Sequence, residues 1–152
     1  MREWYAGGQA EILLVDDSPA TIRLMADLFR EVDPYARIST ARDGMEALAF
    51  LKREGAWASA PRPDLILLDL GLPKLNGHEV LAEIKADPEL RPIPVLILSG
   101  SWYEPDVERS YELGATCFIK VPLELDDFVA TIREIVRFWM EVAVLPSRVT
   151  AA

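Results

Sequence analysis

Five short strand-like runs, which alternate with segments of helical periodicity, constrain the fold of this chain more than any other feature. The runs cover residues 12–15, 37–40, 65–68, 95–98 and 116–119. The third run is entirely apolar, which is typical of a strand covered on both faces. Between the runs, apolar residues recur every three or four positions, as in amphipathic helices. Five such units predict an α/β fold with a parallel sheet between two layers of helices.

Capping residues and changes of pattern indicate how the chain is organised. Ser18 and Pro19 suit the first turn of a helix. A final helix is expected from residue 126 to about residue 144. The predicted organisation is a loosely ordered N-terminus at 1–10, one domain at 11–139, and an extension of the last helix with a tail at 140–152.

Composition excludes several classes of protein. Of the 152 residues, 51% are hydrophobic and 27% are charged, which is the balance of a globular chain. The net charge of −9 argues against nucleic acid as a partner, because phosphate neutralisation needs excess lysine and arginine. No apolar run is long enough to cross a membrane. Cys117 is the only cysteine, so no internal disulfide forms and a cytoplasmic location is expected.

Polar residues follow the predicted strands at the points where the strands end. Asp16 and Asp17 follow the first run, Asp69 the third, Ser99 the fourth, and Lys120 ends the fifth. In an open parallel sheet the functional site lies beyond these carboxyl ends. With the strand order 2-1-3-4-5, the first and third strands are neighbours, so three carboxylates crowd one crevice. Such carboxylates raise one another's proton affinity, and a hard cation such as Mg²⁺ removes the conflict.

The same arrangement suits phosphoryl transfer. Asp69 is placed to attack phosphorus and form an aspartyl phosphate. A metal ion, the hydroxyl of Ser99 and a lysine would offset the charge on the phosphoryl oxygens. Gly71, two residues beyond Asp69, could offer its backbone carbonyl to the metal.

Three motifs resemble the receiver domains of two-component response regulators over about residues 11–139. They are Ile-Leu-Leu-Val-Asp-Asp at 12–17, Leu-Leu-Asp-Leu-Gly-Leu-Pro at 67–73 with a glycine at 77, and Leu-Ser-Gly at 98–100. The resemblance implies a flavodoxin-like, doubly wound five-stranded sheet of order 2-1-3-4-5 with an extended C-terminal helix. It implies a phosphoprotein of signal transduction, not an enzyme, whose partner is a sensor histidine kinase.

The resemblance also implies a role for each residue of the site. Asp69 is the phosphoacceptor, and Asp16 and Asp17 hold Mg²⁺ together with Asp69 and the carbonyl of Gly71. Ser99 is the switch hydroxyl. Phe118 stands where the family has its switch aromatic residue.

The lysine position departs from the family pattern. The family has a Lys-Pro pair at the end of the fifth strand, whereas this chain has Lys120, Val121 and Pro122. An ungapped alignment places Val121 at the lysine position. Because successive strand side chains alternate between faces, Lys120 is expected to point away from the site unless a bulge re-aims it. A phosphorylation-impaired receiver, acting as a constitutive interaction module, therefore stays open as an alternative.

Large apolar residues extend beyond the expected end of the domain. They are Phe138, Trp139, Val142, Leu145 and Pro146. This ending resembles the response regulators that partner bacterial phytochromes, in which the last helix and its extension mediate homodimers. The resemblance implies a phytochrome-type kinase and a homodimer, because exposed apolar patches mark interfaces. The alternative is that these residues fold back onto their own subunit.

Other function classes fit less well. Hydrolases resembling the haloacid dehalogenases carry a second aspartate two residues after the nucleophile, where this chain has Gly71. A nucleotide-binding protein would need a glycine-rich loop after the first strand. A transcription factor would need a further domain after Trp139 and a basic surface. The lone His78 is expected to be a solvated surface residue, and Cys117 to fill the core.

Overall fold

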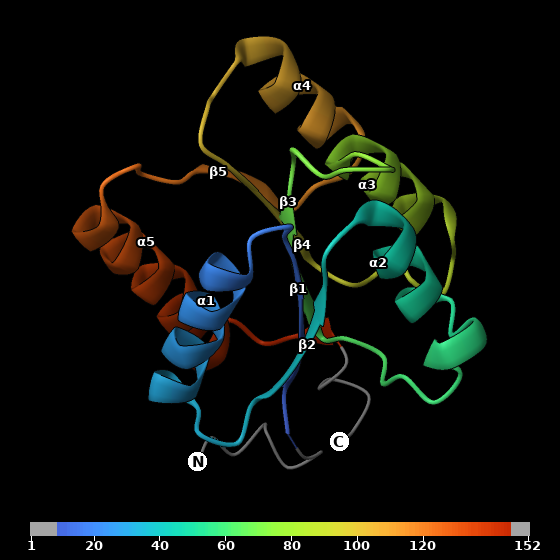
Figure 1. The fold of residues 1–152 in the computed structure, drawn as a ribbon, viewed down its shortest axis with the longest axis horizontal. Helices are drawn as coiled ribbons and strands as arrows, with labels where there is room; N and C mark the ends of the chain where they lie inside the picture. Colours follow the sequence, from blue (N-terminus) through green and yellow to red (C-terminus); the bar gives the residue numbers. More distant parts are fainter. Residues whose placement is uncertain (1–8, 147–152) are drawn as a thin grey trace.

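The computed structural model describes residues 9–146 and contains one five-stranded parallel sheet (Figure 1). The strands are β1 (Glu11–Val15), β2 (Arg37–Ala41), β3 (Leu65–Asp69), β4 (Val95–Ser99) and β5 (Cys117–Lys120). Their order is β2-β1-β3-β4-β5, and all four pairings are parallel. The predicted fold class and strand order are therefore confirmed.

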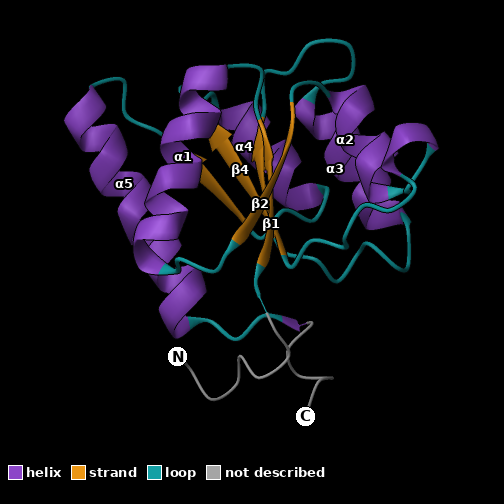
Figure 2. Ribbon diagram, turned by 60° about the horizontal axis from the view of Figure 1, so that its bottom comes forward, coloured by secondary structure: helices purple, strands orange, loops and turns teal. Residues whose placement is uncertain are grey.

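Helices cover both faces of the sheet. They are α1 (Pro19–Val32), α2 (Gly44–Leu51), α3 (Gly77–Ala86), α4 (Glu104–Glu112) and α5 (Leu125–Arg137), with a short 3-10 helix η2 (Gly55–Trp57). In Figures 1 and 2, α1 and α5 lie together on one side of the sheet and α2 and α3 on the other. This arrangement leaves the carboxyl ends of all five strands at one edge, where the loops to the helices begin.

Successive side chains of each strand point to opposite faces of the sheet, which divides the interior into two cores. One, here the α1–α5 core, contains Leu14 and Leu67 from the sheet and Phe29 and Ile132 from the helices. The other, here the α2–α3 core, contains residues of the opposite parity, such as Val15 and Leu68. Residues 65–68 of β3 are at most 1% exposed, as predicted for a strand covered on both faces. A side chain's place along its strand therefore fixes the face on which it lies.

The start of the chain is ordered slightly earlier than expected. Ala10 is fully buried, and its carbonyl accepts a hydrogen bond from the Arg37 N–H at 2.8 Å. The loosely ordered segment predicted at 1–10 is therefore wrong at Ala10, because this residue extends the pairing of β1 with β2. Residues 1–8 of that segment, and 147–152 of the predicted tail, lie outside the described residues.

A wide turn ends the last helix. After α5, a π-helical turn η3 (Phe138–Val142) follows, and the Ala143 N–H donates to the Phe138 carbonyl at 2.7 Å. Helical structure therefore stops two residues before the predicted end at 144. The chain then turns back, so that Leu145, like Met140, is 1% exposed within the α1–α5 core.

The apolar ending is divided between the core and the surface. Placing Leu145 in a dimer interface is wrong for this structure, because its own subunit buries it. Trp139 is partly buried against the same core. Phe138 and Val142 remain 50% and 66% exposed, and Pro146 is also exposed. Some of these residues therefore fold back and others face outward, and the homodimer stays a prediction.

Candidate functional site

Three carboxylates meet at the carboxyl edge of the sheet. Asp16 and Asp17 follow β1, and Asp69 ends the neighbouring β3. Each offers one oxygen, and the three oxygens lie within 4.8 Å of one another. Asp16 and Asp69 are partly buried, whereas Asp17 is exposed. The structure therefore brings the predicted acidic residues together at the junction of two central strands.

Local backbone bonds position two of these carboxylates. Asp16 Oδ1 accepts the Ser18 N–H at 2.8 Å, and Ser18 in turn caps α1 by accepting the Thr21 N–H at 3.3 Å. Asp69 Oδ1 accepts the Gly71 N–H at 3.3 Å. Each bond engages one oxygen from the loop side, which helps to hold the carboxylates at the crevice.

Burial makes the negative charges of this cluster costly. The pKa of Asp16 rises from 3.8 to about 6, mainly because the carboxylate is buried; the Ser18 hydrogen bond opposes this rise, and the charges of Asp69 and Asp17 add to it. Burial also raises the pKa of Asp69, and the charge of Asp17 adds to the effect. A bound divalent cation would remove this cost, and carboxylate oxygens suit hard cations. The donor set therefore fits a hard divalent metal.

Two glycines near Asp69 have different roles. A Cβ built on Gly71 would meet nothing within 4 Å, so sterics do not require a glycine there. A Cβ built on Gly77 would lie 2.7 Å from both the Asp69 carbonyl oxygen and Leu70 Cα. The Gly77 N–H also donates to the Leu70 carbonyl at 3.0 Å. The missing side chain of Gly77 therefore lets α3 begin directly against the backbone of Asp69.

Ser99 ends β4, the neighbour of β3, at the carboxyl edge of the sheet. Its hydroxyl accepts the Ser101 N–H at 3.2 Å. The preceding residue, Leu98, is the register partner of Asp69, which places Ser99 at the same edge of the sheet. Ser99 therefore ends the strand next to that of Asp69, with its side chain on the opposite parity.

Lys120 is at the end of β5 but on the other face. The pairing of β4 with β5 runs without interruption from Leu96↔Cys117 to Ser99↔Lys120, so no bulge re-aims the chain. Cys117, Ile119 and Val121 pack on the α1–α5 core, which is the side of Leu67 and hence of Asp69. Lys120 has the opposite parity, is exposed, and forms no ion pair with the carboxylates of the described residues.

Phe118 has a partner that the sequence did not indicate. Its side chain packs partly buried against the α2–α3 core. Its backbone N–H, on the edge strand, donates to the hydroxyl of Tyr111 in α4 at 3.1 Å. No spacing along the chain signals this contact, because it depends on how α4 lies over β5.

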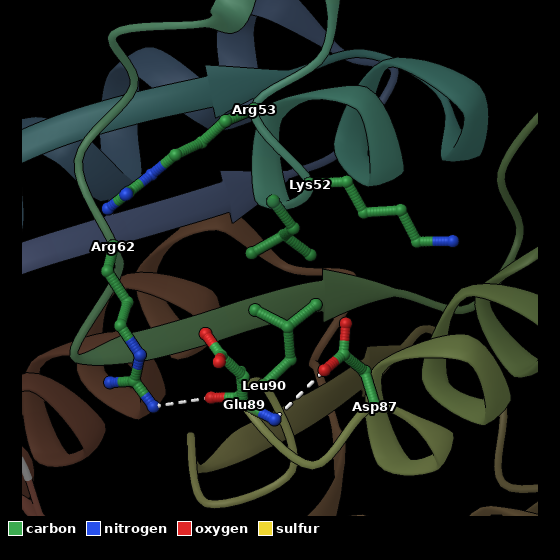
Figure 3. Close-up of a pocket in the computed structure, with 7 residues that line it drawn as sticks. Lys52, Arg53, Arg62, Asp87, Glu89 and Leu90 are labelled. Atoms are coloured by element: carbon green, nitrogen blue, oxygen red, sulfur yellow. Dashed lines mark hydrogen bonds between the residues drawn. The ribbon is translucent and has the colours of Figure 1, made fainter.

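A separate pocket lies at the opposite edge of the sheet (Figure 3). It has a volume of about 420 Å³ and lies between the end of α2 and the loop after α3. Lining residues are Leu51, Lys52, Arg53, Arg62, Asp87, Glu89 and Leu90. Two of its cations already have partners: Arg62 donates to the Glu89 carbonyl at 2.8 Å, and Lys52 lies 3.2 Å from Glu83 Oε2. Arg62 and Lys52 are therefore already engaged by neighbouring groups of the protein.

Comparisons with known proteins agree with the geometry. Residues 12–133 match the response regulator receiver domain. Response regulator Rcp1 of Synechocystis sp. is 44% identical over 136 residues, covering 90% of this chain and 92% of Rcp1. No helix of residues 9–146 is long and apolar enough to span a membrane.

Solved structures give the same result. The Mn²⁺-bound form of Rcp1 superposes with a TM-score of 0.87 at 44% identity, covering 90% of this chain and 99% of that one. The phosphorylated cyanobacterial phytochrome response regulator RcpA gives 0.87 at 46% identity, with 91% and 99% covered. The bacteriophytochrome response regulator AtBRR gives 0.67 at 38% identity, with 91% and 98% covered. As its motifs predict, this chain belongs to the family of response regulator receiver domains.

Proposed function

We propose that this receiver is switched by phosphorylation of Asp69 by a sensor histidine kinase of the phytochrome type. The observation that carries the proposal is the meeting of three carboxylate oxygens within 4.8 Å at the ends of β1 and β3. The similarity to RcpA and to AtBRR, both named as phytochrome response regulators, supports the choice of kinase. In this role the protein is a signalling phosphoacceptor and not an enzyme, and it works in the cytoplasm.

Each residue of the site has a defined part in phosphoryl transfer. A carboxylate oxygen of Asp69 attacks the phosphorus, the new P–O bond forms, and the P–N bond to the donor histidine breaks. Asp16, Asp17, Asp69 and the Gly71 carbonyl would hold Mg²⁺, which when bound neutralises charge on the phosphoryl oxygens. Ser99 donates its hydroxyl hydrogen to one of those oxygens.

The position of Lys120 favours a second candidate function. Lys120 is exposed and forms no ion pair with the carboxylates of the described residues, so in this candidate no lysine of the fifth strand offsets the phosphoryl charge. A receiver of this kind could instead act as a constitutive interaction module. Incubation with acetyl phosphate and Mg²⁺, followed by intact-mass analysis, separates the two. A mass gain of one phosphoryl group that is lost in Asp69→Asn supports the switch, whereas an unmodified wild type supports the module.

We further propose a homodimer built on the exposed part of the C-terminal segment. Phe138 and Val142 are large exposed apolar residues at the two ends of η3. Two-fold symmetry would let one such patch bury itself against its own copy. The net charge of −9 agrees with protein partners and not with nucleic acid.

A further inference from the structure

Helix α4 buries one side chain between its ends, and that side chain is polar, while its C-cap residue Leu113 packs partly buried on the α2–α3 core. Ser110 is the only buried residue between Glu104 and Glu112. Most helices dock by burying an apolar stripe, and α4 has none. Along the helix itself, the position of α4 therefore depends on a few hydrogen bonds of its side chains.

One of these attachments comes from His78, near the start of α3. Its Nε2 lies 3.0 Å from Ser110 Oγ and 3.3 Å from the Asp106 carbonyl oxygen. The Ser110 hydroxyl donates its own hydrogen to that carbonyl at 2.8 Å, so its oxygen is left to accept. Nε2 is therefore the protonated nitrogen and donates to both groups. The expectation of a solvated His78 is wrong, because tertiary packing brings α4 over this side chain.

The other side of His78 connects to the phosphoacceptor. Gly77 precedes it and touches the backbone of Asp69 and Leu70 so closely that no side chain fits between them. The Gly77 N–H is also bonded to the Leu70 carbonyl. A shift of the loop after β3 therefore moves the first turn of α3, and with it the imidazole that holds α4.

From this chain of contacts we infer that His78 is a positioning residue that transmits the phosphorylation state of Asp69 to α4. The inference rests on the proposed phosphorylation of Asp69. His78 lies in the first turn of α3, whose backbone is packed against the loop after Asp69. Its Nε2–H donates to Ser110, the only buried side chain of α4, and to the Asp106 carbonyl in the first turn of that helix.

Hydrogen exchange of the full chain tests the attachment in the unphosphorylated protein. In His78→Ala, exchange of the α4 amides should rise about tenfold, since a lost hydrogen bond to a buried group lowers the local opening energy. Amides of β1 and β3 should not change, which also shows that the variant is folded. His78→Gln retains an N–H donor and should restore much of the protection. Glu108→Ala, at an exposed α4 position, is the matched control and should behave as wild type. Unchanged α4 exchange in His78→Ala would overturn the inference.

The second arm adds acetyl phosphate and Mg²⁺ and monitors both mass and exchange. In the wild type, phosphorylation should change α4 exchange, and in His78→Ala this change should disappear while the mass gain persists. A phosphorylation-dependent change that survives in His78→Ala would exclude transmission through this residue. Absence of any mass gain in the wild type would instead refute the proposed phosphorylation, and with it the transmission.

Discussion

Lys120 is the register partner of Ser99 in the last step of the β4–β5 pairing. The next backbone N–H, from Val121, donates to the Ser99 carbonyl at 2.8 Å. The two strands therefore stay in step up to the site, and the residue whose side chain shares the face of Asp69 is Val121. By the same alternation Lys120 shares the face of Ser99, and its failure to reach the phosphorylation site stays a prediction.

Moving the lysine by one position should strengthen the switch. Val121→Lys should prolong the lifetime of the aspartyl phosphate by about tenfold, the scale of one charge-assisted hydrogen bond. Lys120→Ala is the control and should change the lifetime little. Both are measured by intact mass after removal of acetyl phosphate. A large loss in Lys120→Ala would show that Lys120 reaches the phosphoryl group.

The acidic cluster should make the metal-free protein less stable as the pH rises. The pKa of Asp16 is raised in the fold to about 6, so its contribution is present below pH 4 and is lost as the pH rises through about 6. For a half-exposed group screened by water, we expect a loss of about 1 kcal/mol. Urea unfolding with EDTA from pH 4 to 7.5 measures it, and Asp16→Asn should flatten this part of the profile. Added Mg²⁺ should restore stability at pH 7. A wild-type profile identical to that of Asp16→Asn would contradict this explanation.

The two glycines around Asp69 should respond differently to a methyl group. Gly77→Ala places a Cβ 2.7 Å from backbone atoms of Asp69 and Leu70 and should cost about 1–3 kcal/mol in the free energy of unfolding. Gly71→Ala meets open space and should cost less than about 0.5 kcal/mol. Urea denaturation compares the two variants. Equal stabilities would mean that the contact of α3 with β3 relaxes freely.

The C-terminal segment offers a comparison between an exposed and a buried apolar residue. Phe138→Ala should weaken the homodimer by about 2 kcal/mol and leave the monomer folded, because the ring is half exposed. Leu145→Ala should instead cost about 2–5 kcal/mol in unfolding, because it leaves a cavity in the α1–α5 core. Sedimentation and urea unfolding separate the two effects. A wild-type monomer at high micromolar concentration would rule out the dimer.

The sheet and its acidic edge could be predicted because they depend on short-range patterns. A strand and the polar residue that follows it are adjacent in sequence, so Asp16, Asp69 and Ser99 could be placed before any contact was known. The alternation rule predicts the face that Lys120 takes, but its distance from the phosphoryl group stays a prediction.

Other features depend on contacts between distant segments. Helical periodicity does not show that α5 ends in a π-helical turn or that Leu145 returns to the core. The hydrogen bond of His78 to α4 joins residues 32 positions apart. It is a polar contact, and the apolar periodicity that predicts helix packing does not indicate it.

The polar attachment of α4 has a thermal consequence. Releasing a helix with a single buried serine exposes little apolar surface, so the heat-capacity change of its undocking is small. Global unfolding exposes both cores, and its free energy is strongly curved with temperature. The van't Hoff plot for the undocking of α4 should therefore be nearly straight. Over the same temperatures, the free energy of global unfolding should pass through its maximum.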